Sequence, residues 1–200
     1  MAVAESTRRE ELLRIAGQLF ARKGFRSTTV RDIADSAGIL SGSLYHHFDS
    51  KETMVDELLD SFQRRLFETY DAIIAGEQSP REKLVAVARA SFDAIDQHHS
   101  EVAIFQNDAG YLAEFDRFSY LIERNARFQQ MWTDLLRAGI TSGELRADLD
   151  VELVYRFLRD TVWVAVRWYR PGGSLSGDEV ADQYISILLD GIAATEGATK

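Results

Sequence analysis

The stretch "TTVRDIADSAGILSGSLYHHF", residues 28–48, decides the fold. Thr29 can cap a short helix over 30–37, and Gly38 provides the tight turn that ends it. A second short helix fits residues 41–48, so the two helices form a helix-turn-helix. The apolar residues are spaced so that they pack this unit together: Ile33, Ala34, Ile39, Leu44 and Phe48.

The second helix of this unit leaves small polar side chains facing outward. They are Ser41, Gly42, Ser43, Tyr45, His46 and His47. A helix that enters the major groove needs small residues near the DNA backbone, and hydrogen-bond donors where it meets phosphates and base edges. Thr29, Arg31 and Lys51 flank this helix and are expected to contact neighbouring phosphates. The sequence therefore predicts double-stranded DNA as a partner.

Helical periodicity dominates the rest of the chain, which indicates an all-α fold of about nine helices. An apolar stripe precedes Gly24, where the first helix is expected to end. Asp49 or Ser50 is expected to cap a long helix from Lys51 to Ala75. Further helices are predicted at 81–97, 101–112, 117–141, 150–169 and 178–194.

Charge is distributed unevenly along the 200 residues. Residues 1–51 carry 8 Lys and Arg against 6 Asp and Glu, a net charge of +2, whereas the whole chain has a net charge of −9. A mildly basic head on an acidic body fits a head that meets a polyanion, although chance produces a difference of this size equally well.

Several classes of protein are disfavoured by the composition. The chain has no cysteine, so disulfides, a thiol nucleophile and a Cys-type zinc site are excluded. The N-terminal charges are not followed by an apolar run, and no stretch of about 18 residues is free of charge. We therefore expect no signal peptide, no membrane partner and a cytoplasmic location.

The segment "TTVRDIADSAGILSGSLYHHFDSKETMVDELL" resembles the TetR family of transcriptional repressors. The resemblance implies a homodimer with a DNA-binding head and a helical ligand and dimerisation domain. We accordingly expect a helix-turn-helix domain over 1–50, a connecting helix over 51–76, and an effector-binding and dimerisation domain over 77–200. One departure is Leu40–Ser41, where many members have serine and then a basic residue, and we expect Ser41 to supply the cap.

The segment "VELVYRFLRDTVWVAVRWYRPGG" has two different faces when about 100° is counted per residue. One face, spanning about 80°, combines guanidinium groups with an indole: Arg156, Arg159, Trp163, Arg167 and Arg170. The opposite face suits either the core or a dimer seam: Val154, Phe157, Leu158, Thr161, Ala165 and Trp168. Guanidinium groups bind phosphates bidentately and an indole can stack on a purine, so the first face is predicted to bind an acyl-CoA. A solvated charged face is the plainer alternative.

This C-terminal segment also resembles one branch of the family, the repressors of late steroid-ring (cholesterol C and D ring) catabolism. The resemblance implies that the effector is a CoA thioester of the indanedione propanoate, and that no other cofactor is needed. A different acyl-CoA or another anionic hydrophobic effector is the alternative. The homodimer is expected to form through the helices at 150–169 and 178–194, and the second helix offers an apolar stripe for this seam: Val180, Tyr184, Ile187, Leu188 and Ile192.

Other functions have less support in the sequence. Adjacent histidines such as His98 and His99 point about 100° apart on a helix, so a shared metal ion is not expected. A CoA-ester hydrolase would need a nucleophile or base, and neither a G-x-S-x-G turn nor a histidine lies near the Arg/Trp segment. A helical adaptor would leave the recognition helix without a role. Eight aromatic residues between positions 92 and 132 are expected either to form the core or to line a pocket: Phe92, Phe105, Tyr111, Phe115, Phe118, Tyr120, Phe128 and Trp132.

Overall fold

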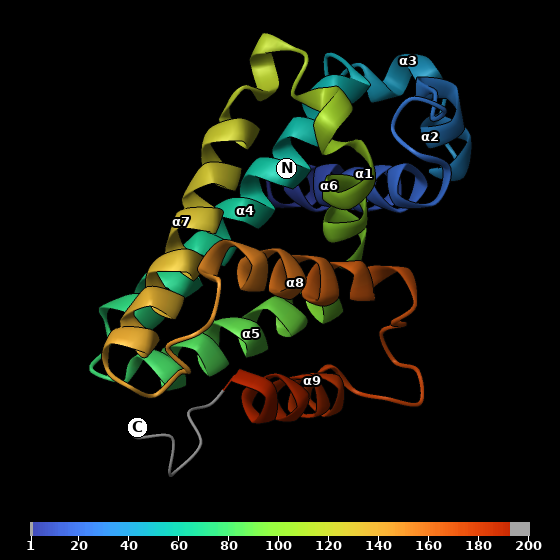
Figure 1. Ribbon diagram of the computed structural model, residues 1–200. Coiled ribbons are helices and arrows are strands. Elements are labelled where there is room, and N and C mark those ends of the chain that lie inside the picture. Colours follow the sequence, from blue (N-terminus) through green and yellow to red (C-terminus); the bar gives the residue numbers. More distant parts are fainter. Residues whose placement is uncertain (1, 193–200) are drawn as a thin grey trace. The chain divides into compact units, whose positions relative to one another are not determined.

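The computed structural model describes residues 2–192, which form nine α-helices and two short 3-10 helices without any strand (Figure 1). The predicted all-α class is therefore confirmed. The helices are α1 (Ala2–Lys23), α2 (Val30–Ser36), α3 (Ser41–Leu44), α4 (Lys51–Ala75), α5 (Pro80–Gln97), α6 (His99–Leu112), η1 (Asp116–Phe118), α7 (Tyr120–Thr141), α8 (Val151–Trp163), η2 (Val164–Arg167) and α9 (Gly177–Ile192).

The chain forms two compact units that interleave along the sequence. The first unit takes the residues up to Arg64 together with Ser100–Tyr120, so it holds the helix-turn-helix, the start of α4 and nearly all of α6. The second unit takes Arg65–His99 and the residues from Leu121 onward. Helix α4 thus contributes residues to both units. The expected boundaries after residues 50 and 76 stay predictions.

The first unit is held together by apolar side chains of α1, α2, α3 and α4. The predicted helix-turn-helix core is confirmed for Ile33, Ala34, Leu44 and Phe48, which are all buried, whereas Ile39 is only partly buried. Helix α1 ends where expected, since Gly24 has a φ of 83° that favours glycine. Figure 1 shows α2 and α3 beside α1, with which α2 packs.

Capping residues explain where α2 and α4 begin. The side chain of Thr29 accepts a hydrogen bond from the Asp32 N–H, and the Asp32 carboxylate accepts one from the Thr29 N–H, which completes a capping box. The hydroxyl of Ser50 accepts from the Thr53 N–H at 3.2 Å. Both predicted caps are therefore confirmed, with Ser50 rather than Asp49 starting α4.

The second unit stacks α5 between α8 and α9 (Figure 1). Its interior contains a cluster of aromatic rings whose centroids lie 5.8–5.9 Å from that of Phe128. Tyr70, Trp132 and Trp163 each contact Phe128 in this cluster. The Tyr70 hydroxyl pairs with the hydroxyl of Ser91 at 2.7 Å, which satisfies a fully buried polar group.

The predicted helix over 150–169 is wrong at its C-terminal end. Helix α8 stops at Trp163, and the chain continues as the 3-10 helix η2 before the turn at Pro171 and Gly172. A 3-10 turn advances each side chain by about 120° rather than 100°. Directions calculated for one continuous α-helix therefore do not hold beyond Trp163.

Candidate DNA-binding and effector sites

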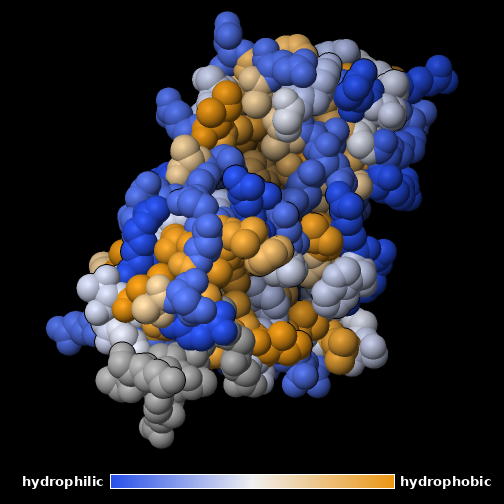
Figure 2. Space-filling model, in the orientation of Figure 1, coloured by the Kyte–Doolittle hydropathy of each residue, from blue (hydrophilic) through white to orange (hydrophobic). Residues whose placement is uncertain are grey.

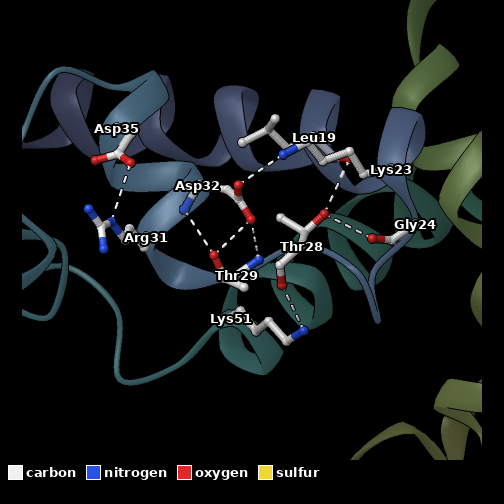
Figure 3. A network of polar contacts seen from close by, with 9 residues as sticks. All are labelled: Leu19, Lys23, Gly24, Thr28, Thr29, Arg31, Asp32, Asp35 and Lys51. Atoms are coloured by element: carbon white, nitrogen blue, oxygen red, sulfur yellow. Dashed lines mark hydrogen bonds and ion pairs between the residues drawn. The ribbon is translucent and has the colours of Figure 1, made fainter.

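The N-terminus of α2 is fixed by a polar network around Asp32 (Figure 3). The Lys23 ammonium donates to Asp32 Oδ1 at 2.9 Å, and the Thr29 N–H and hydroxyl donate to Oδ2 at 2.8 and 2.7 Å. The hydrogen bond from Lys23, followed by those from Thr29, holds the pKa of Asp32 well below its ordinary value. The expected DNA contact Thr29 thus lies in a preorganised cap, with its side chain partly engaged.

Lys51 ties α4 to the loop that precedes α2 (Figure 3). Its ammonium donates to the carbonyl oxygens of Phe25 and Thr28, each at 2.8 Å, and lies 4.4 Å from the centroid of the Phe25 ring. The buried Thr28 hydroxyl in turn donates to the Gly24 carbonyl at 2.8 Å. Lys51 therefore stabilises the head from within, and its expected phosphate contact stays a prediction.

The recognition segment is shorter as an α-helix than predicted. Helix α3 covers Ser41–Leu44, and hydrogen-bonded turns carry the chain on to Phe48. The expected cap by Ser41 is wrong, because Leu40 occupies the N-cap position without a side-chain hydrogen bond and Ser41 is already helical. Gly42, Tyr45 and His46 are exposed, while three others are partly exposed: Ser41, Ser43 and His47.

A hollow of about 330 Å³ lies between the start of α2 and the start of α4. Its lining combines hydroxyls, cations and two carboxylates: Arg26, Thr28, Thr29, Val30, Tyr45, Asp49, Ser50, Lys51 and Glu52. Arg31 stands outside this hollow with a side chain 85% exposed, and its ion pair with Asp35 is long, at 3.7 Å. The structure thus brings Thr29, Tyr45 and Lys51 together and leaves Arg31 free to move toward a polyanion.

The predicted Arg/Trp face is divided by the structure. Arg156, Arg159, Arg167 and Arg170 are exposed, but Trp163 is only 7% exposed and packs on Phe128. The Arg159 Nε donates to Asp160 at 2.7 Å, and its guanidinium lies 5.9 Å from the Tyr155 ring. Arg170 lies beyond η2 and donates to the carbonyls of Arg167 and Tyr169. The indole of Trp163 therefore does not share the exposed surface of the four guanidinium groups, and the role of these residues in binding an effector stays a prediction.

The aromatic cluster contains an unsatisfied polar group. The indole nitrogen of Trp132 is buried and has no hydrogen-bond partner, the one such side-chain atom found in the described part of the chain. Leaving a buried donor unpaired costs about 1–3 kcal/mol. Trp132 was expected to be core or pocket lining, and its unpaired N–H is a feature that a bound acceptor would satisfy.

The apolar face expected over residues 150–169 lies only partly on the surface. Phe157 is 62% exposed and Trp168 is 57% exposed, whereas Leu158 and Ala165 are buried. Ile187 of α9 is 74% exposed. Figure 2 shows hydrophobic side chains gathered over α8 and α9. A groove of about 550 Å³ between these elements is lined by Phe92, Thr161, Trp168, Leu175, Glu179, Val180, Asp182, Gln183, Tyr184 and Ile187.

The remaining residues of that predicted seam follow the same pattern only in part. Val180 is buried, Tyr184 packs on Phe92 with centroids 5.2 Å apart, and Leu188 is partly exposed. The side chain of Ile192, and residues 193–194 of the predicted helix, lie outside the described residues.

His98 and His99 end one helix and begin the next. His99 Nε2 lies 3.3 Å from the carbonyl oxygen of Tyr169. Among the described residues, no three His, Cys, Asp or Glu side chains are grouped so that they could hold a metal ion. No helix of the described residues is long and apolar enough to cross a membrane.

Two family descriptions match this chain. Residues 12–58 match "Bacterial regulatory proteins, tetR family", and residues 77–192 match "Tetracyclin repressor-like, C-terminal domain". The chain is 57% identical over 190 residues to the HTH-type transcriptional repressor KstR2 of Rhodococcus jostii, covering 95% of this chain and 93% of that protein.

Solved structures show the same fold. The ketosteroid transcriptional regulator KstR2 of Mycobacterium tuberculosis superimposes with a TM-score of 0.92 at 55% identity, covering 94% of this chain and 96% of that one. AibR, solved with isovaleryl coenzyme A and operator DNA, superimposes with a TM-score of 0.78 at 20% identity, covering 91% and 98%.

Proposed function

The chain belongs to the tetR family of bacterial regulatory proteins and is a transcriptional repressor similar to KstR2. From this premise we propose that a CoA thioester of a steroid C/D-ring degradation intermediate releases it from its operator. The relatives and the fold are those of regulators rather than of enzymes. An acyl-CoA would act as an effector, with no chemistry performed on it.

One observation carries the effector proposal: α8 joins an exposed guanidinium to a buried aromatic cluster. Arg159 lies over Tyr155, and Trp163, four residues later, packs on Phe128. An acyl-CoA has the matching distribution of properties, because its phosphates are anionic and its acyl rings are apolar. We infer that Arg159 binds the CoA end, with Arg156, Arg167 and Arg170 adding positive charge.

The acyl end would enter the aromatic cluster of the second unit. Steroid-like rings need apolar walls, and the unpaired N–H of Trp132 can donate to a ring carbonyl. The name of the 55% identical KstR2 structure refers to ketosteroids, which supports this chemical class. AibR shows that the fold is compatible with a CoA thioester and with DNA.

We propose that the repressor acts as a homodimer through α8 and α9. Phe157, Trp168 and Ile187 are large apolar side chains exposed to water, and Trp168 and Ile187 line the same groove, so a second copy that covered them would bury apolar surface. Pairing these helices with those of a second copy makes a four-helix seam and places two heads on one side of the duplex. Sedimentation at micromolar concentration should give a dimer, whereas a monomer would contradict this assembly.

Release would follow from a shift between two populations. The effector must bind the DNA-incompetent state more tightly, by the factor with which it lowers operator affinity. The direct experiment starts from an operator duplex that the wild-type protein selects from a random pool. Calorimetry should then show binding of the indanedione propanoyl-CoA, and a panel of other acyl-CoA esters tests the alternative effector. Tighter binding and release by a straight-chain ester would move the assignment to that alternative.

A further inference from the structure

Phe25 is held through both polar groups of its backbone, each by a different helix. Its N–H donates to Asp108 Oδ2 of α6 at 3.1 Å, and its carbonyl accepts from Lys51 of α4 at 2.8 Å. Phe25 follows Gly24, which ends α1, and precedes Thr29, which caps α2. The position of the loop that leads into the helix-turn-helix therefore depends on α6 as well as on α4.

Asp108 is unusual because its carboxylate is buried. At 8% exposure it is the one acidic side chain classed as buried among those that the structure describes. Burying a carboxylate is unfavourable unless its charge is hydrogen-bonded. The bond to the Phe25 N–H meets this need, and it spans 83 residues of sequence. A residue at this position that served only to pack α6 would be apolar, so the carboxylate points to a directional role.

Helix α6 contacts the same loop a second time. The guanidinium of Arg26 lies 4.8 Å from the centroid of the Tyr111 ring. Asp108 and Tyr111 are three residues apart, so they project from one face of α6. One face of α6 thus contacts two successive loop residues, Phe25 and Arg26. Movement of α6 would disturb both contacts together.

We propose that Asp108 is the positioning residue through which a displacement of α6 releases the loop before α2. A hydrogen bond of 3.1 Å is lost when the donor and acceptor separate by roughly another ångström, so a small movement of α6 suffices. The inference rests on the proposed function, because the effector is what would favour the displaced α6. By linkage, operator binding that fixes the loop must weaken effector binding by the same factor.

The test compares wild type with Asp108→Ala and Asp108→Asn, using the selected operator and the indanedione propanoyl-CoA as the probe. Asp108→Ala should weaken operator binding about tenfold without the probe, since a charge-assisted hydrogen bond is lost. Saturating probe should then raise the operator Kd of Asp108→Ala by less than about threefold, whereas it should raise that of wild type by about thirtyfold or more. Asp108→Asn keeps an acceptor oxygen and should restore much of both properties. Asn107→Ala, an exposed neighbour on α6, is the matched control and should behave like wild type.

Hydrogen exchange at the amide of Phe25 reports on the bond itself. Exchange should be fast in Asp108→Ala, slow in free wild type, and fast in wild type with the probe. An Asp108→Ala protein that keeps the wild-type operator Kd, or the full wild-type response to the probe, would overturn the inference. A wild-type protein that does not bind the probe in calorimetry would instead defeat the effector proposal. In that case the probe-free operator Kd and exchange rate of Asp108→Ala still decide the positioning role.

Discussion

The loop before α2 and the segment around Arg159 both combine a cation with buried aromatic rings, but they differ in how completely their polar groups are paired. In the loop, Lys51 and Asp108 bind the backbone of Phe25 from two sides. In the second unit, Arg159 is exposed and the indole N–H of Trp132 has no partner. The first arrangement suits a head presented to a rigid duplex, and the second retains capacity for a small ligand.

The largest effect is expected when the buried indole of Trp163 in α8 is removed. Trp163→Ala should lower the free energy of unfolding by about 3–5 kcal/mol, because a large side chain is removed from the core. Urea denaturation measures this loss. Trp163→Phe, which keeps a ring against Phe128, should lose much less. Equal stability of wild type and Trp163→Ala would mean that the indole is not buried in the folded protein.

Lys51→Ala should have the next largest effect, on the stability of the head. Its ammonium binds two loop carbonyls, so its removal should cost about 2–3 kcal/mol of unfolding free energy as well as operator affinity. Arg31→Ala is the matched control, since its exposed guanidinium has only a long ion pair. That variant should keep its stability and lose operator affinity, with a salt dependence reduced by about one unit of slope. If Lys51→Ala were as stable as wild type, the bonds from Lys51 to the loop carbonyls would not stabilise the head.

Arg159→Ala should weaken the effector alone. Loss of one charge-assisted contact costs about 2 kcal/mol, or about thirtyfold in affinity for the CoA thioester. Calorimetry gives this number, and the operator Kd without effector should match that of wild type. Arg159→Lys keeps the charge without the planar fork and should fall between the two. Wild-type effector affinity in Arg159→Ala would place the CoA elsewhere.

The smallest effect is expected for Trp132→Phe. Removing an unpaired buried N–H is favourable and removing ring volume is unfavourable, so stability should change by no more than about 1 kcal/mol. If the N–H donates to a ring carbonyl, affinity for the ketone-bearing thioester should fall up to about tenfold. A thioester whose ring carbonyls are reduced to methylenes should bind both proteins alike. Equal loss for both ligands would indicate a packing role only.

The head was predictable from sequence because its determinants are local. Thr29 and Ser50 lie next to the helices that they cap, and the spacing of Ile33, Leu44 and Phe48 defines the packing of a short unit. The prediction that Ser41 caps the recognition helix was wrong, because Leu40 occupies the N-cap position and makes no side-chain hydrogen bond there.

The effector region was less predictable, because its determinants lie far apart in the sequence. The helical wheel assumed one α-helix to residue 169, so the change to 3-10 geometry after Trp163 moved Arg167 and Arg170 away from the predicted face. Trp163 is buried against a residue far away in the sequence, Phe128 of α7. Nothing in the local pattern distinguishes Asp108 from the acidic surface residues of this chain, since its partner is Phe25.

Release of wild-type protein from labelled operator tests the central claim most directly. The titrants are the indanedione propanoyl-CoA, the free indanedione propanoate and CoA itself, followed by fluorescence anisotropy at fixed salt. We predict release by the thioester at a concentration at least about thirtyfold below that required for either part alone, because Arg159 and the aromatic cluster bind the two ends together. Release by the free acid at the same concentration as the thioester would contradict this account.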